Sequence, residues 1–104
     1  MKKIVKMVEE KLVVDLKAKR FSLVLPENPK PLSTIDYVVK NDVFYLEHTN
    51  TPPEEQGKGL AGKLSKQVFD YLLENKIKFY PVCSYLVHYC DKNKIPYDEN
   101  DSKL

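Results

Sequence analysis

The most restrictive feature of this sequence is a short apolar run joined to a helical pattern by a loop of prolines and glycines. The run from Asp42 to His48 is apolar and aromatic, and the pair Pro52-Pro53 follows it, which predicts a buried strand that cannot continue. Beyond the loop, apolar residues recur at helical spacing and predict a helix from Leu60 to Asn75. Its inward positions are Leu60, Leu64, Val68, Tyr71 and Leu72. Glycines 57 and 59 therefore stand where a helix begins.

The start of this helix is suited to binding an anion. The first backbone N–H groups of a helix have no partner within it, and the helix dipole places positive charge at the same end. Gly57 and Gly59 lack Cβ atoms and let a phosphate approach the backbone, while Lys58 adds a positive charge. A P-loop needs Ser or Thr directly after its lysine, and Leu64 follows Lys63 here, so a nucleoside triphosphate is disfavoured.

The spacing of Gln56, Gly59 and Ala61 resembles the pyrophosphate loop of the GNAT superfamily of acyl-CoA-dependent N-acetyltransferases. Further segments resemble, in the same order, the small single-domain group of GNAT-like proteins, and the resemblance covers residues 20–97. These segments are Arg20-Phe21-Ser22, Glu47-His48-Thr49, the loop with its helix, and Pro81-Val82-Cys83 followed by Tyr85 and Tyr89.

This resemblance implies a fold and a cosubstrate. The fold class is α/β of the α+β type, with a mixed, mostly antiparallel sheet and two principal helices. The resemblance also implies that acetyl-CoA binds at Gln56, Gly57, Lys58, Gly59, Leu60, Ala61 and Gly62. Two departures stand out: Gln56 replaces an arginine common in the small group, and Asn50 replaces an acidic residue.

Glu47 and His48 are the candidates for the base that deprotonates an acceptor amine. Because neighbours on a strand point to opposite faces, we expect only one of them to face the cleft. Histidine side chains can take up and release a proton near neutral pH, which suits His48 to the role of base; its alternative role is to hold the loop by a hydrogen bond. Glu47 would need a raised pKa or a relaying water, and its alternative is a charge facing solvent.

Tyr89 matches the position where the resemblance places a tyrosine that protonates the departing thiolate; otherwise it is an aromatic core residue. Tyr85, one helical turn earlier, is the second candidate for this role. Cys83 lies where a strand gives way to a helix, so the helix dipole favours its thiolate. It is an acyl acceptor, a thiol packed against the CoA sulfur, or a small buried apolar residue. We expect Cys90 to lie in the core.

The remaining elements follow from apolar periodicity and turn residues. Residues 1–18 suit a helix or a strand, and we favour an early strand. Prolines between residues 26 and 31 predict a stiff loop after a half-buried strand at Arg20–Leu25. The other predicted elements are strands at Thr34–Val39, Val43–Glu47 and Lys76–Val82, a tight turn at residues 40–42, and a second helix to about Asn93 with Ser84 as N-cap. The strand, helix, strand order requires the last strand to be parallel to its neighbour.

Composition narrows the class of protein. The 104 residues are 42% hydrophobic and carry a net charge of +2 without a basic stripe, so we expect one domain at residues 1–97, a polar tail at residues 98–104, and no nucleic-acid partner. No apolar run is long enough for a membrane span or a secretory signal, which predicts a cytoplasmic protein. Two cysteines give neither a disulfide framework nor a metal site. We expect a monomer or a weak dimer: an exposed edge at the strand Arg20–Leu25 could pair with a second copy, but the flanking Lys17 and Lys19 argue against such pairing.

The sequence thus predicts a small N-acetyltransferase that moves an acetyl group from acetyl-CoA to an amine. The acceptor amine cannot be identified from the sequence. Two alternatives remain: a non-catalytic CoA-binding or protein-interaction module with the same fold, and a loop whose glycines only turn the chain.

Overall fold

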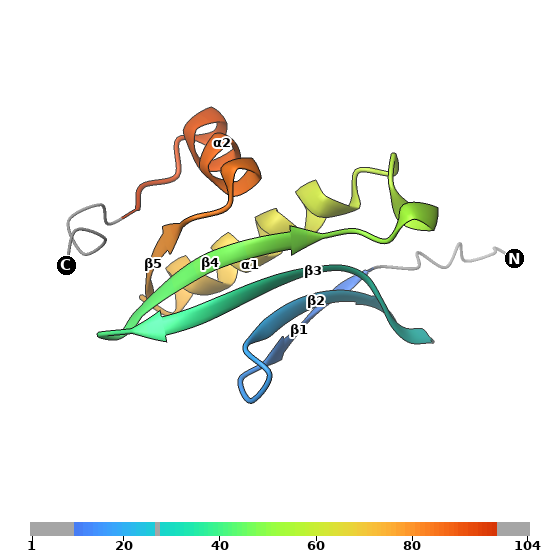
Figure 1. Ribbon diagram of the computed structural model, residues 1–104, viewed down its shortest axis with the longest axis horizontal. Helices are drawn as coiled ribbons and strands as arrows, with labels where there is room; N and C mark the ends of the chain where they lie inside the picture. Colours follow the sequence, from blue (N-terminus) through green and yellow to red (C-terminus); the bar gives the residue numbers. More distant parts are fainter. Residues whose placement is uncertain (1–9, 27, 98–104) are drawn as a thin grey trace, which may run out of the picture.

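The computed structural model describes residues 10–26 and 28–97. Their core is a five-stranded sheet in the order β1-β2-β3-β4-β5 (Figure 1). The strands are β1 (Lys11–Asp15), β2 (Arg20–Leu25), β3 (Asn28–Lys40), β4 (Val43–Asn50) and β5 (Lys78–Pro81). The first four strands are antiparallel to their neighbours, and only β5 is parallel to β4. The predicted mixed, mostly antiparallel sheet is confirmed.

Two helices complete the fold, as predicted. α1 (Leu60–Glu74) packs on one face of the sheet and lies behind β4 in Figure 1, whereas α2 (Ser84–Asn93) lies beside β5. A short 3-10 helix, η1 (Pro53–Glu55), precedes α1. The side chains shared between α1 and the sheet are fully buried and include Phe21, Ile35, Leu46, Leu64, Val68 and Leu72. Neither α1 nor α2 has both the length and the apolar character needed to span a bilayer, judged over the described residues.

The hairpin between β3 and β4 is fixed by its turn. Asn41 and Asp42 have φ values of 52° and 66°, so both adopt the left-handed conformation of a type I′ turn. Lys40 and Val43 pair directly on either side. This turn matches the right-handed twist of the strands, so the predicted tight turn is confirmed and sets the register of β4.

The N-terminal half differs from prediction in two ways. The early strand predicted within residues 1–18 exists as β1, and residues 1–9 of that segment lie outside the described residues. Because β1 pairs with one edge of β2 and β3 with the other, β2 has no free edge, and the expectation of an exposed strand edge at Arg20–Leu25 that could pair with a second copy is wrong. Burial is also greater than predicted, since Ser22 and Val24 on the second face of β2 are each only 9% exposed.

The stiff loop predicted around the prolines is instead the start of β3. Asn28 pairs with Leu25 and Ser33 with Leu23, but the register shifts between these two pairs. Pro29 and Pro31 fall within this irregular stretch, where no ladder hydrogen bond is required of them. A strand can therefore contain both prolines without losing its regular pairing further along.

Candidate functional site

The loop between β4 and α1 depends on two glycines for its path. Gly57 has a φ of 85°, and Gly59, the N-cap of α1, has a φ of 73°. Side chains other than glycine rarely adopt this left-handed conformation. A Cβ atom added to either residue would meet nothing within 4 Å. The glycines are thus required by the backbone, and they leave open space above it.

The first turn of α1 is exposed to this space without a cap. The first hydrogen bond of the helix runs from the Lys63 N–H to the Gly59 carbonyl at 3.1 Å. Gly59 provides no side-chain cap, and the first turn contains no acidic residue. The N–H groups of Leu60, Ala61 and Gly62 precede the first helical bond and are therefore directed to a ligand or to water. Together with the helix dipole they favour an anion.

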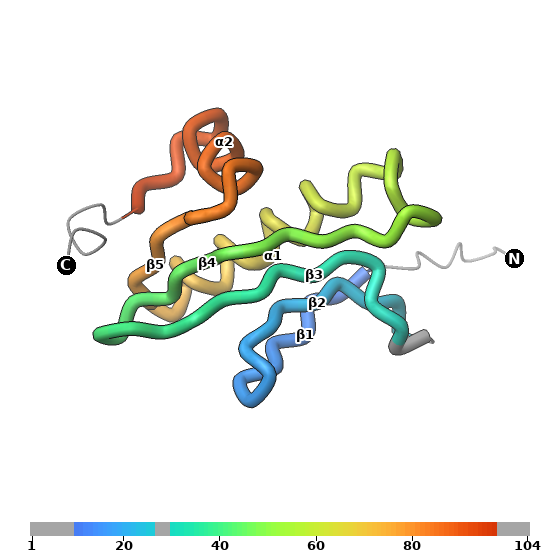
Figure 2. Tube along the Cα trace, in the orientation of Figure 1, coloured from blue at the N-terminus to red at the C-terminus, as the bar shows by residue number. Residues whose placement is uncertain are grey.

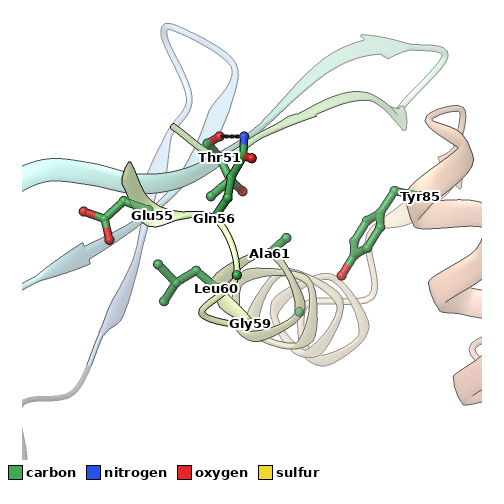
Figure 3. Close-up of a pocket in the computed structure, with 9 residues that line it drawn as sticks. Thr51, Glu55, Gln56, Gly59, Leu60, Ala61 and Tyr85 are labelled. Atoms are coloured by element: carbon green, nitrogen blue, oxygen red, sulfur yellow. Dashed lines mark hydrogen bonds between the residues drawn. The ribbon is translucent and has the colours of Figure 1, made fainter. Parts of the chain in front are cut away.

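A pocket of about 270 Å³ lies over this helix end (Figure 3). Every residue predicted to contact acetyl-CoA lines it except Lys58, whose Nζ lies 3.0 Å from the Glu55 carboxylate. Gln56 donates a hydrogen bond from Nε2 to the Thr51 carbonyl at 2.9 Å, which ties the middle of the loop to its first residue. The charge of Lys58 is therefore compensated locally, and Gln56 stabilises the loop itself.

Thr51, Glu55 and Tyr85 complete the pocket, and the sequence did not predict them there. The sequence carries no local signal for Thr51, because its hydroxyl is held by the Ser33 hydroxyl of β3, a contact between distant parts of the chain. The Tyr85 ring reaches over from α2, with its hydroxyl directed toward the first turn of α1 (Figure 3). This hydroxyl would lie 3.7 Å from a Cβ atom at Gly62, so Gly62 and Tyr85 are close neighbours.

β4 and β5 separate beside this pocket. Their parallel pairing ends at Leu46 and Pro81. The N–H groups of Val82 and Cys83 both donate to the Leu46 carbonyl, at 2.9 and 3.1 Å, as the chain turns into α2. β4 continues to Asn50, and Figure 2 shows it running on while the chain after β5 turns away. The edge of β4 after Leu46 is thus not paired with β5.

Glu47 forms a bulge at this unpaired edge. Leu46 pairs with Tyr37 and His48 with Asp36, so Glu47 is an extra residue in β4. The bulge places Leu46 and His48 on opposite faces of β4, so the regular alternation of the strand is interrupted there, and which of Glu47 and His48 faces the cleft stays a prediction. His48 shares the face of its partner Asp36 and is exposed, whereas Glu47 is half-buried.

Cys83 lies across from Thr49 on the other side of the separation. It is the N-cap of α2, in place of the predicted Ser84, because its carbonyl accepts the first bonds of the helix from Leu86 and Val87, both at 3.0 Å. Thr49 Oγ1 donates to Cys83 Sγ at 3.5 Å. Burial raises the pKa of the Cys83 thiol, but hydrogen bonds from Thr49 and from the backbone of Leu86 and Tyr85 outweigh it and leave this pKa below its ordinary value.

The two candidate tyrosines have different surroundings. The Tyr89 ring stacks on Phe69 with centroids 5.7 Å apart, and burial raises the pKa of its hydroxyl. It lines a hollow between α1 and α2 that also contains Lys66 and Asp70. Tyr85, in contrast, lines the pocket at the loop. The structure therefore brings Tyr85 to the pocket and packs Tyr89 against the core.

Cys90 is buried, as predicted, and burial raises the pKa of its thiol to about 11. Residues 10–26 and 28–97 contain no group of three or more His, Cys, Asp or Glu side chains that could hold a metal ion. Cys83 is thus the more acidic thiol of the two.

Comparison with known proteins assigns the family. Residues 20–100 match the model of the family described as GCN5-related N-acetyl-transferase. The chain belongs to this family. Its loop, pocket and strand separation therefore lie in a GCN5-related fold, as the sequence resemblance predicts.

Individual relatives are similar over most of the chain. Protein NATD1 of Xenopus tropicalis is 31% identical over 83 residues, which span 79% of this chain and 75% of the relative. Protein NATD1 of Homo sapiens is 33% identical over 61 residues, or 59% of this chain and 53% of the relative. The solution structure of a GCN5-like protein from Staphylococcus aureus, named as a candidate N-acetyltransferase, superposes with a TM-score of 0.56 at 28% identity and covers 83% of this chain and 80% of that one.

Proposed function

We propose that this protein binds acetyl-CoA at the β4–α1 loop and transfers the acetyl group to an amine. One observation carries the proposal: two left-handed glycines open the uncapped end of α1 into a pocket beside the separation of β4 and β5. The pyrophosphate of CoA is an anion that such a helix end binds through backbone N–H groups. Membership of the GCN5-related family supports the choice of ligand.

The residues around the pocket fit this ligand. The N–H groups of Leu60, Ala61 and Gly62 would hold the pyrophosphate, and no side chain at Gly57 or Gly59 obstructs it. Bound acetyl-CoA supplies an activated thioester. The unpaired edge of β4 and the N-cap of α2 are the parts of this chain that would receive the thioester end.

The residues at the strand separation supply the chemistry of acyl transfer. An acceptor ammonium must lose a proton before it can attack, and His48 and Glu47 at the bulge are the candidate bases. The departing thiolate must gain a proton, and both predicted candidates remain, Tyr89 and its alternative Tyr85, of which Tyr85 lines the loop pocket. Cys83 has its thiolate stabilised by Thr49 and stays a candidate acyl acceptor.

We further propose that the protein acts in a reducing compartment such as the cytoplasm. Cys83 and Cys90 are both free thiols. Thiols persist where glutathione and thioredoxin keep them reduced. Expression of a fluorescent fusion of the full chain, followed by microscopy, checks this location.

Calorimetric titration with CoA and acetyl-CoA tests the cosubstrate. The wild type should bind both, and Gly59→Glu should bind neither, because it places a side chain and a negative charge at the anion site. Leu73→Glu is the matched control, since it adds the same charge to α1 at a side chain that is 47% exposed near the far end of the helix. Failure of the folded wild type to bind would contradict the proposal. Binding without transfer to any amine would favour a non-catalytic CoA-binding module.

A further inference from the structure

A second pocket, of about 360 Å³, lies on the face of the sheet that α1 does not cover. Arg20, Lys30, Thr34, Asp36 and Asn50 line it, together with two prolines. Thr34 pairs with Asn50 and Ile35 with Thr49, so the lining residues of β3 and β4 lie on the face opposite the buried Ile35. Figure 1 looks onto this face, with α1 behind the sheet.

One short segment separates this pocket from the loop pocket. Asn50 and Pro52 line the second pocket, while Thr51 between them lines the pocket at the α1 N-terminus. The Ser33 and Thr51 hydroxyls lie 2.8 Å apart, which holds Thr51 on the side of α1. Ligands in the two pockets would therefore approach the end of β4 from opposite faces of the sheet.

A lateral row of charged groups connects the second pocket to the unpaired edge of β4. Strand register places Asp15 beside Arg20, Arg20 beside Asp36, and Asp36 beside His48. Arg20 Nε lies 2.6 Å from Asp36 Oδ1. His48 ends the row next to the Glu47 bulge, where β4 has separated from β5. A ligand bound at Arg20 and Asp36 thus lies one strand away from the candidate base.

We propose that this second pocket is the acceptor site and that it takes a free amino acid, an amine with a carboxylate on the neighbouring carbon. The inference rests on the proposed acetyltransferase function. The Asp36 carboxylate can bind an ammonium group. The guanidinium of Arg20 donates to Asp36 through Nε–H, and its other N–H groups can donate to the carboxylate of a ligand. Lys30, 3.3 Å from Glu54, adds a second positive charge to the wall. Arg20 and Lys30 are each paired with a carboxylate of the chain, so the preference for an amino acid over a simple alkylamine comes from the remaining guanidinium donors of Arg20, which an alkylamine would leave without a carboxylate.

Every bond, proton and electron pair of the proposed acetyl transfer can be accounted for with the two ligands, His48 and solvent. The ammonium of the amino acid gives one proton to His48, and the nitrogen lone pair forms a bond to the thioester carbonyl carbon. The carbon–sulfur bond then breaks, its electron pair leaves with the CoA sulfur, and the sulfur takes up a proton as the free thiol. The second proton lost from nitrogen passes to solvent, and the product is an N-acetyl amino acid.

Amide chemical shifts of the ¹⁵N-labelled protein test the site directly, without CoA. An equimolar mixture of the twenty common amino acids should move the signals of Arg20, Thr34, Asp36 and Asn50. Each amino acid that acts alone is then compared with the amine lacking its carboxylate and the acid lacking its amine, both of which should bind about tenfold more weakly or worse.

Two variants and a control define the contacts. Arg20→Gln and Asp36→Asn should each weaken amino-acid binding by about tenfold or more, and both should fold because these side chains are 50% and 38% exposed. Lys66→Gln is the control: it removes a different exposed ion pair, the one between Lys66 and Asp70 on α1, and it should leave amino-acid binding unchanged. The site is overturned if no amino acid moves these signals, or if the alkylamines bind as well.

A CoA titration of the same samples separates this inference from the function on which it rests. Binding of CoA without binding of amino acids would overturn the acceptor site and leave the acetyltransferase proposal standing. Binding of amino acids without binding of CoA would overturn the acetyltransferase proposal and with it the acceptor role of the pocket.

Discussion

Gly59 and Gly62 lie three residues apart but differ in what they require of the backbone. Gly59 has a φ of 73°, so Gly59→Ala should destabilise the fold by about 1–2 kcal/mol through strain alone. Gly62 is helical, and a Cβ atom there meets only the Tyr85 hydroxyl at 3.7 Å, an ordinary contact. Gly62→Ala should therefore stabilise by about 0.5–1 kcal/mol. Urea denaturation of both variants measures the two effects, and equal stability would contradict the assignment.

The hydrogen bond from Thr49 is one of the interactions that lower the pKa of the Cys83 thiol. In Thr49→Val the hydrogen bond to Sγ is lost while burial remains, so the pKa of the thiol should rise. The folded pKa in the wild type is below the unfolded one, so this thiol stabilises the fold above the unfolded pKa, and that contribution is lost as pH falls through the folded pKa. The pH dependence of iodoacetamide alkylation, measured in a Cys90→Ala background, follows the shift. An unchanged midpoint would show that Thr49 does not contribute.

Individual site residues could be predicted from sequence only where local rules apply. The glycines and Gln56 follow from spacing along one segment, and they line or stabilise the loop pocket. The position of Tyr85 in the pocket does not follow from spacing along one segment, because its place over Gly62 depends on how α2 packs against α1. The bulge at Glu47 could not be predicted from the sequence either, since only the register with β3 shows that β4 contains one extra residue there.

At the scale of the elements, packing of α2 on α1 positions Tyr85 over the pocket. Leu86 is fully buried in the shared core, so Leu86→Ala should destabilise by about 2–5 kcal/mol. Leu73→Ala on α1 is the control, because that side chain is 47% exposed, and it should cost no more than about 0.5 kcal/mol. Thermal denaturation compares the two, and a similar loss in both would mean that α2 is not anchored by Leu86.

Most elements could be predicted because their patterns are local. The strand before the loop and the helix after it follow from a short apolar run and helical spacing, and both exist close to the predicted bounds. The length of β3 could not be predicted, because its prolines are tolerated only where the pairing with β2 is irregular. The pairing of β1 with β2 decided between strand and helix for residues 11–15, and that contact is tertiary.

For the whole molecule, the sheet separates two pockets at the end of β4. The loop pocket faces α1 and α2, and the second pocket lies on the opposite face. The segment 50–52 contributes to both walls, since Asn50 and Pro52 line the second pocket and Thr51 lines the loop pocket, while the edge of β4 after Leu46 is not paired with β5. Ligands bound in the two pockets would therefore not compete for the same surface.

If acetyl-CoA binds the folded protein and not the unfolded chain, as proposed, its binding should stabilise the whole fold by mass action. At a ligand concentration one hundred times the Kd, the gain is about 2.7 kcal/mol, which for a chain of this length raises the Tm by about 10 to 20 °C. Gly59→Glu should show no such rise, whereas Asp36→Asn on the opposite face should show the full rise. Calorimetric scans at several acetyl-CoA concentrations measure it. A rise that Asp36→Asn abolished would mean that the two pockets are not independent, and a rise that Gly59→Glu retained would place the cosubstrate away from the α1 N-terminus.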